Sequence, residues 1–454
     1  MRFKRQYLFI LIASLGMFIT PAKARAEDLA CLYGYAHEND PSLQAAKAAQ
    51  LSARQALPLA RSQFLAVING TATYNNNWSN DPFIARGYHQ DIYALNLTQP
   101  ILNFTHWAKY KQANAVVKEA NATYSAAEQD LIIRLARAYF EELQAIDNLF
   151  FAKAQLAAFD KSLDQTEQRS KVGLIASTDV EIARARHDNA FALKIAAEAD
   201  VLDKNEKLRE IVGFVPERLA KLRLELTLPP PEPTNVEEWV KIALEQNFLL
   251  QAQRFKRQAS WQAMRNIEYG HMPSINAVSS YQHIRPNLPF DNQEVDTSVG
   301  IQVNIPIFNG GNILSQTKQA RYDFDKEDRI LEKTYRETET QTRQSFRGVF
   351  TQIEQTAAFK RSVISNQSAV NATEASFTVG TRTIVDVLNS QSDLIKAKSD
   401  FATARYNYII QSLLLKQAAG TLCPEDLCRI NRWLVESSCE ISDKSLGSFK
   451  QGRR

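Results

Sequence analysis

The stretch Phe377-Thr-Val-Gly-Thr-Arg-Thr-Ile-Val-Asp-Val-Leu-Asn389 separates two long helical patterns. A similar break, Ser170-Lys-Val-Gly-Leu-Ile-Ala-Ser-Thr-Asp-Val180, occurs earlier in the chain, and Gly173 precedes Gly380 by 380 − 173 = 207 residues. A glycine between two helical patterns is typical of a helix end followed by a turn. The sequence therefore predicts two helical hairpins, whose tips are the best candidates for a functional site.

Matches at or near this offset run through most of the chain and predict a duplicated structural unit. The predicted segments are a first repeat at 27–228, a linker at 229–233 that contains Pro229-Pro-Pro231, a second repeat at 234–420, and a partly disordered C-terminal segment at 421–454. A helix is expected within this last segment, from Asp426 to Val435.

Each repeat alternates between two periodicities. Residues 66–75 and 93–98 alternate apolar with polar side chains, as do residues 298–305, and this period of two predicts strands with one apolar face. Long helices are expected at 105–171 and 315–377, each of which would extend about 100 Å or slightly less. Return helices are expected at 178–211, with a Thr178-x-x-Glu181 capping box, and at 383–419.

The first 26 residues have the pattern of a secretory signal peptide: Arg2, Lys4 and Arg5, an apolar run, and the small-x-small sequence Ala24-Arg-Ala26. Cys31 follows a poor match to a lipidation motif, so an acyl anchor is a minor alternative. In an oxidising compartment Cys423 and Cys428 either pair or remain thiols, and the spacing does not decide between these states.

Composition argues against several functional classes. A net charge of +4, much of it near the two termini, gives no reason to expect a nucleic-acid partner. The six histidines lack metal-ligand spacing, and no nucleophile motif or phosphate loop is present, so neither a cofactor nor catalysis is expected.

Strands of about ten residues are long enough to cross an outer membrane, but four strands cannot close into a barrel. An open sheet in lipid would leave backbone groups unpaired, so several chains would have to pool their strands; three chains give twelve. Aromatic residues at the strand–helix junctions suit a membrane interface, although each could be a core residue: Phe104, Trp107 and Phe308. The alternative is a soluble sheet packed against helices, which alternates in the same way.

The order of elements, the Pro-Ile-x-Asn turns that begin at Pro100 and Pro306, and the run Val379-Gly-Thr-Arg-Thr-Ile-Val-Asp-Val-Leu388 resemble the TolC family of outer-membrane efflux proteins, in particular its type I secretion branch. The resemblance implies a homotrimer with a 12-stranded β-barrel in outer-membrane lipid and a periplasmic α-helical barrel. It also implies a periplasmic adaptor (a membrane fusion protein) and an inner-membrane pump of the ABC, RND or MFS type, docked at the tips near Gly173 and Gly380. The alternative function is that of a periplasmic adaptor-like hairpin protein without its own pore.

The resemblance also implies a gate at the periplasmic end. Asp386 matches an acidic ring, Asn389 stands where a second acidic ring is expected, and the tether positions are Arg382, Asp164, Phe377 and Glu374. Phe377 lacks the hydroxyl that the family often uses there. Read from local sequence alone, Asp386 is the N3 residue of a helix that starts near Thr383, a role that is compatible with the gate.

Overall fold

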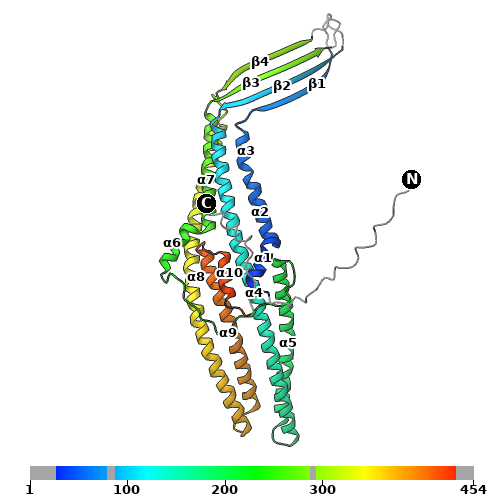
Figure 1. The fold of residues 1–454 in the computed structure, drawn as a ribbon, viewed down its shortest axis with the longest axis vertical. Coiled ribbons are helices and arrows are strands. Elements are labelled where there is room, and N and C mark those ends of the chain that lie inside the picture. Colours follow the sequence, from blue (N-terminus) through cyan, green and yellow to red (C-terminus); the bar gives the residue numbers. More distant parts are fainter. Residues whose placement is uncertain (1–26, 79–86, 287–292, 436–454) are drawn as a thin grey trace, which may run out of the picture.

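The computed structural model describes residues 27–78, 87–286 and 293–435. The predicted signal peptide and the end of the C-terminal segment lie outside these ranges. The molecule is elongated, with a β-sheet at one end, two helical hairpin tips at the other, and short helices beside the middle of the long ones (Figure 1). No helix among the described residues is long and apolar enough to cross a membrane.

The sheet contains four antiparallel strands in the order β1-β2-β3-β4: β1 (Val67–Asn77), β2 (Tyr88–Leu102), β3 (Ser274–Pro286) and β4 (Glu294–Asn304). Each repeat therefore contributes one pair, and the central pairing of β2 with β3 joins the repeats. β1 and β4 are the edges of this sheet, and each pairs with only one neighbouring strand.

The strand register places the apolar residues on one face. Ile68 lies opposite Leu97, Leu95 lies opposite both Gly70 and Tyr281, and Ala277 lies opposite Ile301. The polar face carries the Ser280–Ser298 hydroxyl contact of 2.7 Å. No described residue covers this apolar face, since Ile301 is 71% and Ile68 67% exposed. A soluble sheet would bury this face against helices, so that alternative is wrong for the described chain.

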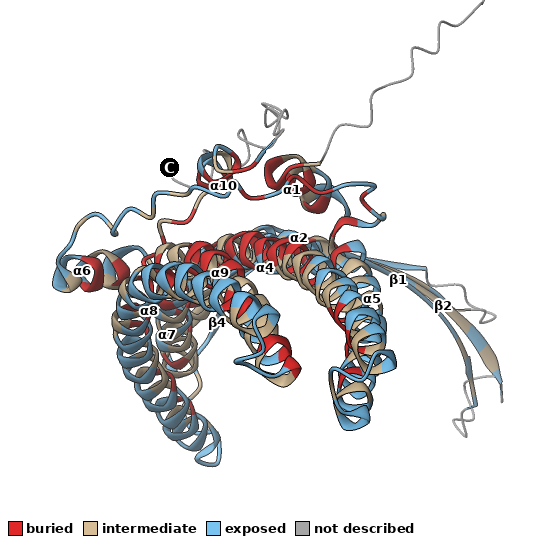
Figure 2. Ribbon diagram, turned by 90° about the horizontal axis from the view of Figure 1, so that it is seen from below, coloured by how far each residue is buried: buried red, intermediate tan, exposed pale blue. Residues whose placement is uncertain are grey.

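Long helices form the rest of the molecule. α4 (Phe104–Lys171) and α5 (Ser177–Val212) form the first hairpin, and α8 (Asn312–Thr378) and α9 (Ile384–Ala418) form the second. All four lie within three residues of their predicted bounds. From below, they form a curved array with α1, α6 and α10 on its convex side (Figure 2).

Shorter helices flank this array. In the first repeat they are α1 (Leu29–Asn39), α2 (Pro41–Arg54) and α3 (Ala56–Ser62); in the second they are α6 (Val236–Gln246), α7 (Phe248–Glu268) and the 3-10 helix η1 (Tyr269–His271). α10 (Pro424–Asn431) ends four residues before the predicted limit at Val435, because Leu434 forms an antiparallel β-bridge with Leu222 instead of continuing the helix. Cys423 and Cys428, at its start and within it, are both free thiols.

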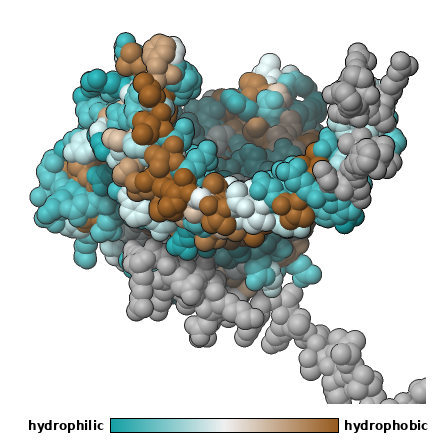
Figure 3. Space-filling view, turned by 90° about the horizontal axis from the view of Figure 1, so that it is seen from above, coloured by the Kyte–Doolittle hydropathy of each residue, from teal (hydrophilic) through white to brown (hydrophobic). Residues whose placement is uncertain are grey.

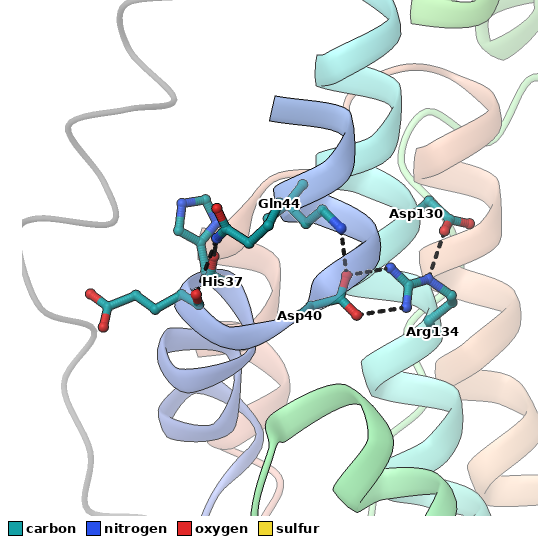
Figure 4. A network of polar contacts seen from close by, with 7 residues as sticks. His37, Asp40, Gln44, Asp130 and Arg134 are labelled. Atoms are coloured by element: carbon teal, nitrogen blue, oxygen red, sulfur yellow. Dashed lines mark hydrogen bonds and ion pairs between the residues drawn. The ribbon is translucent and has the colours of Figure 1, made fainter. Parts of the chain in front are cut away.

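The equivalent breaks between α1 and α2 and between α6 and α7 use different chemistry. The Asp40 carboxylate caps α2 by accepting from the Leu43 N–H at 2.8 Å. Arg134 of α4 donates to both oxygens of the Asp40 carboxylate, at 2.9 and 3.2 Å, and also to Asp130 (Figure 4). Asn247 stands 207 residues later and caps α7 through the Leu250 N–H at 3.0 Å. Its amide donates to the Ala418 carbonyl instead of binding an arginine.

The main hydrophobic core lies in the middle of the molecule, where α4 and α9 cross the short helices. Its largest fully buried side chains include Tyr139, Phe140 and Tyr33. The Tyr139 hydroxyl donates to the Ala220 carbonyl at 2.7 Å, which ties the chain after α5 to α4. This core leaves the sheet and the tips to project from opposite ends of the molecule.

Candidate functional site at the hairpin tips

Both hairpin tips turn through the same backbone motif. Gly173 and Gly380 have φ angles of +76° and +79°, and an added Cβ at either would meet nothing within 4 Å. The N–H of each glycine bonds the carbonyl three residues back, and the next N–H bonds the carbonyl five residues back, at 2.9–3.1 Å in all cases. This is a Schellman ending, in which glycine supplies the left-handed conformation at no steric cost.

The second tip carries a complete capping box. The Thr383 hydroxyl accepts from the Asp386 N–H at 3.3 Å, and the Asp386 carboxylate accepts from the Thr383 N–H at 3.0 Å and from its hydroxyl at 2.9 Å. These two hydrogen bonds, and then Arg382 at 4.0 Å, lower the pKa of Asp386. The cap expected from local sequence is confirmed, and it holds the carboxylate in its charged form.

The first tip has no such cap. α5 begins at Ser177 with Ala176 at the N-cap, and no side chain accepts its free N–H groups. The predicted Thr178–Glu181 capping box is therefore wrong. The turn has the same length as in the second tip, which puts Ala176 at the position of Thr383 and leaves Thr178 inside the first helical turn. Glu181 instead accepts from Arg184 at 3.0 Å.

Three of the expected tether residues, Glu374, Phe377 and Arg382, lie at the second tip, and the fourth, Asp164, lies on α4 of the first hairpin. Glu374 accepts from Gln391 at 2.9 Å, so it links α8 to α9. The Phe377 ring lies 4.6 Å from the Arg169 guanidinium of α4, an interaction between the hairpins. Arg382 is 62% exposed and faces Asp386. Asp164 is exposed on α4 and has no hydrogen bond or ion pair within the described part of this chain.

A small hydrophobic cluster holds the hairpins together behind the tips. Its buried members are Phe159 of α4, Ala183 and Ala190 of α5, and Ile384, Val387 and Leu388 of α9. The two alanines allow α5 and α9 to approach closely, and Phe377 packs against the cluster from α8. The position of Asp386 on α9 is thus set by packing against the first hairpin as well as by its cap.

Polar contacts continue this seam away from the tips, between α4 and α9. Gln155 donates to Ser392 at 3.3 Å, Ser399 donates to Asn148 at 2.8 Å, and Tyr406 donates to Asp147 at 2.7 Å. The two contacts between neutral groups are individually weak, about 1 kcal/mol net each, and the one to the Asp147 carboxylate is roughly 1.5–3 kcal/mol. They give the seam a defined register that a purely apolar seam would specify less well.

The profile of the outer membrane efflux protein family matches residues 32–214 and again residues 239–421. The chain belongs to this family. The two matches begin and end 207 residues apart (239 − 32 and 421 − 214), the same offset as between Gly173 and Gly380.

Relatives of this family match over nearly the full chain. The chain is 35% identical over 436 residues to the outer membrane protein TolC of Vibrio cholerae, covering 94% of this chain and 98% of that protein. It is 34% identical over 442 residues to TolC of Escherichia coli, with 94% and 89% covered. The proteases secretion protein PrtF of Dickeya chrysanthemi is 26% identical over 440 residues, with 93% and 94% covered.

Solved structures share the fold. The Campylobacter jejuni CmeC outer membrane channel superposes with a TM-score of 0.78 at 16% identity, covering 94% of this chain and 89% of that one. The outer membrane protein VceC of Vibrio cholerae gives a TM-score of 0.75 at 18% identity, covering 86% and 96%. The TolC-like fold predicted from the sequence is confirmed.

Membership of the outer membrane efflux family makes the chain an outer-membrane export channel whose helices extend into the periplasm, as the resemblance implied. The family is one of transport proteins and not of enzymes. Among the described residues, no cluster of His, Cys, Asp and Glu could hold a metal ion.

Sequence reasoning did not identify two residues that the structure brings to the tip of this efflux protein. Arg169 stacks on Phe377, and Arg186 of α5 donates to Asn389 of α9 at 3.3 Å. Both contacts cross from one hairpin to the other, over about 200 residues of sequence. The only available signal was the helical spacing of Ala183, Arg186 and Ala190, which places the arginine on the apolar side of α5.

Proposed function

We propose that three copies of the chain assemble into one conduit, with twelve strands closing a barrel in the outer membrane and six hairpins extending it through the periplasm. The observation that carries this proposal is the open sheet. Its edge strands β1 and β4 each have one side without a partner, and its apolar face is exposed. Unpaired backbone in lipid is prohibitive, so β4 of one chain would pair with β1 of the next.

The faces of the sheet fit this assembly. From the strand end, hydrophobic residues form a curved band beside a hollow in which hydrophilic residues predominate (Figure 3). In the assembled barrel the apolar residues would face lipid and the Asn, Thr, Ser and Gln residues would line a water-filled passage. Trp107 and Phe308, 51% and 86% exposed, would lie at the membrane interface, with the 38% exposed Phe104 beside them.

At the other end, the second tip would close the conduit. Three copies of Asp386 would converge on the axis as one carboxylate ring, and Asn389 would leave the second ring uncharged. Arg382 is free to reach Asp164 of an adjacent chain, since neither side chain is buried in the single chain. Such a ring attracts cations and narrows the passage.

The apolar turn residues beside the two glycines suit docking of a periplasmic adaptor, which would connect the conduit to an inner-membrane pump. Val172 is 70%, Leu174 73% and Val379 75% exposed. Type I protein secretion and efflux of small molecules are the two export roles proposed, and the relative PrtF, a proteases secretion protein by its name, supports a secretion role. No catalytic step is needed, because the pump supplies the energy. The adaptor-like alternative predicts one hairpin flanked by split β-domains, whereas this chain has two hairpins, one in each copy of the unit.

The test is reconstitution of the full-length protein. Detergent extracts of outer membranes should contain a trimer that dissociates on heating, and this trimer should form discrete channels in planar bilayers. A stable monomer in the aqueous fraction that forms no channels would overturn the proposal.

A further inference from the structure

Arg186, which is not one of the expected tether residues, makes a second polar contact between the hairpins near the tips, beside that of Arg169 with Phe377. Its Nη2 donates to the Asn389 Oδ1 at 3.3 Å, from α5 of the first hairpin to α9 of the second. Ala183 and Ala190 lie three residues before and four residues after Arg186, and both are buried in the cluster that joins these helices. The helical spacing therefore places Arg186 on the face of α5 that packs against α9.

Asn389 connects this contact to the proposed gate. It lies three residues after Asp386, which is one helical turn and about 4.5 Å along the axis of α9. It also directly follows Leu388, which is 1% exposed and anchors α9 in the same cluster. The hydrogen bond from Arg186 to Asn389 therefore restrains the same turn of α9 that carries Asp386.

The charge at this site is unbalanced. Asn389 is neutral, and no carboxylate of the described residues lies within ion-pair distance of Arg186. The nearby Arg184 differs, since it is paired with both Glu181 at 3.0 Å and Glu167 at 3.2 Å. Arg186 thus has no carboxylate partner among the described residues, and the residue that it bonds, Asn389, lies about one helical turn from Asp386 along α9.

We propose that Arg186 is a positioning residue of the gate, which latches α9 to α5 through Asn389 and opposes cation binding at the Asp386 ring. In a trimer, three guanidinium groups would lie where a second acidic ring would otherwise bind cations. The inference rests on the proposed channel and on Asp386 facing its axis. It assigns to the first hairpin a direct role in closing the second.

The experiment is a double-mutant cycle on the full-length trimer, read by single-channel conductance and by block with Mg²⁺ or hexamminecobalt(III) from the periplasmic side. Arg186→Gln should raise conductance, because the shorter glutamine side chain would lose the hydrogen bond to Asn389. It should also lower the cation concentration needed for block, because the positive charge is removed. Arg186→Lys should keep the block weak, because it retains the charge. This separates an electrostatic role from a packing role.

Asn389→Asp alone should change the block little, because Arg186 would neutralise the new carboxylate. Arg186→Gln with Asn389→Asp should block at a concentration lower by on the order of tenfold, the factor that corresponds to ~1.4 kcal/mol. Arg184→Gln is the matched control and should behave as wild type, since its partners lie on the first hairpin. Circular dichroism and heat-dissociation of the trimer would confirm that each variant is assembled.

Equal block by Asn389→Asp with and without Arg186, or wild-type conductance and block in Arg186→Gln, would overturn the role of Arg186 while leaving the channel itself intact. An absence of channels in the wild-type protein would instead overturn the proposed function, and the inference with it.

Discussion

At the first hairpin tip Ala176 stands at the N-cap of α5, whereas at the second tip Thr383 occupies the equivalent position and forms a capping box with Asp386. The turns themselves are the same, with a left-handed glycine and the same two backbone hydrogen bonds. The comparison separates two requirements. Glycine is enough to reverse the chain, so the side chains of each tip were free to diverge toward different roles.

The divergence is consistent with gate chemistry at one tip only. Asp179 of the first tip aligns with Asp386, but the N-cap residue three positions before it is Ala176, which has no hydroxyl with which to form a capping box. The second tip also makes the contacts that cross between the hairpins, through Phe377 and Asn389. Four measurements would break or sharpen this contrast.

The largest effect is expected from the gate tether. Arg382→Ser combined with Asp164→Ala should raise single-channel conductance several-fold in planar bilayers, because it removes both sides of a contact proposed to hold neighbouring chains together. Arg184→Ser with Glu181→Ala removes a comparable exposed pair from the first tip and should leave conductance unchanged. Unchanged conductance in the first variant would exclude Arg382 and Asp164 from the gate.

The next effect concerns block by cations. Because Asn389 is uncharged, Asp386 should be the only carboxylate on which block by divalent or trivalent cations depends, and Asp386→Ala should abolish this block. Asp179→Ala changes the aligned residue of the first tip and should preserve the block. Residual block in Asp386→Ala would show that another carboxylate faces the passage.

A smaller effect should be the same at both tips. Gly173→Ala and Gly380→Ala should each destabilise its turn by roughly 1–2 kcal/mol, the cost of a left-handed conformation for a residue with a Cβ. No neighbour lies within 4 Å of either added Cβ, so no clash should distinguish them. Hydrogen exchange of the two turns would measure the costs, and a large difference would contradict the equivalence of the turns.

The smallest effect tests the caps. Thr383→Ala should weaken the start of α9 by about 1 kcal/mol, and Ala176→Thr should strengthen the start of α5 by up to a similar amount. The lowered pKa of Asp386 means that its contribution is fully present above the ordinary Asp value of about 3.9 and is lost as pH falls through the lowered value. Hydrogen exchange at 384–388, measured against 177–181, would report both changes; no response to Thr383→Ala would show that packing alone fixes this turn.

Much of the fold was accessible from the sequence, because period-two and helical patterns are local and long. The four long helices lie within three residues of their predicted bounds, because their apolar patterns extend over many residues. The alternating stretches at 66–75, 93–98 and 298–305 fall on β1, β2 and β4, although β2 is much longer than its predicted stretch. The prediction of a Thr178–Glu181 cap was wrong because the backbone geometry of the glycine turn fixes where α5 begins. The helix therefore starts at Ser177, and Thr178 lies inside its first turn. The glycine of the preceding turn would have placed the N-cap correctly by comparison with the second repeat.

The gate was harder to predict, because it depends on contacts between distant segments. The family resemblance implied that Asp386 belongs to the gate, and the local spacing of Thr383 and Asp386 predicted the cap, but Arg186 and Arg169 are recognised only once the two hairpins lie side by side. The pairing proposed for Arg382 and Asp164 lies between chains, so a single sequence carries no direct trace of it. Local patterns specify elements well, and they specify the contacts between elements only through their apolar faces.

α4 runs without a break from Phe104, next to the last residues of β2, to Lys171 at the first tip, over 68 residues. At 1.5 Å per residue this is a continuous rod of about 100 Å. A rod without a joint cannot swing open at one point, and any motion at its end must be shared as slight bending over many turns. Opening the conduit for cargo would thus require a slight bend along the full length of the long helices. The end next to the β-sheet would stay fixed in the outer membrane.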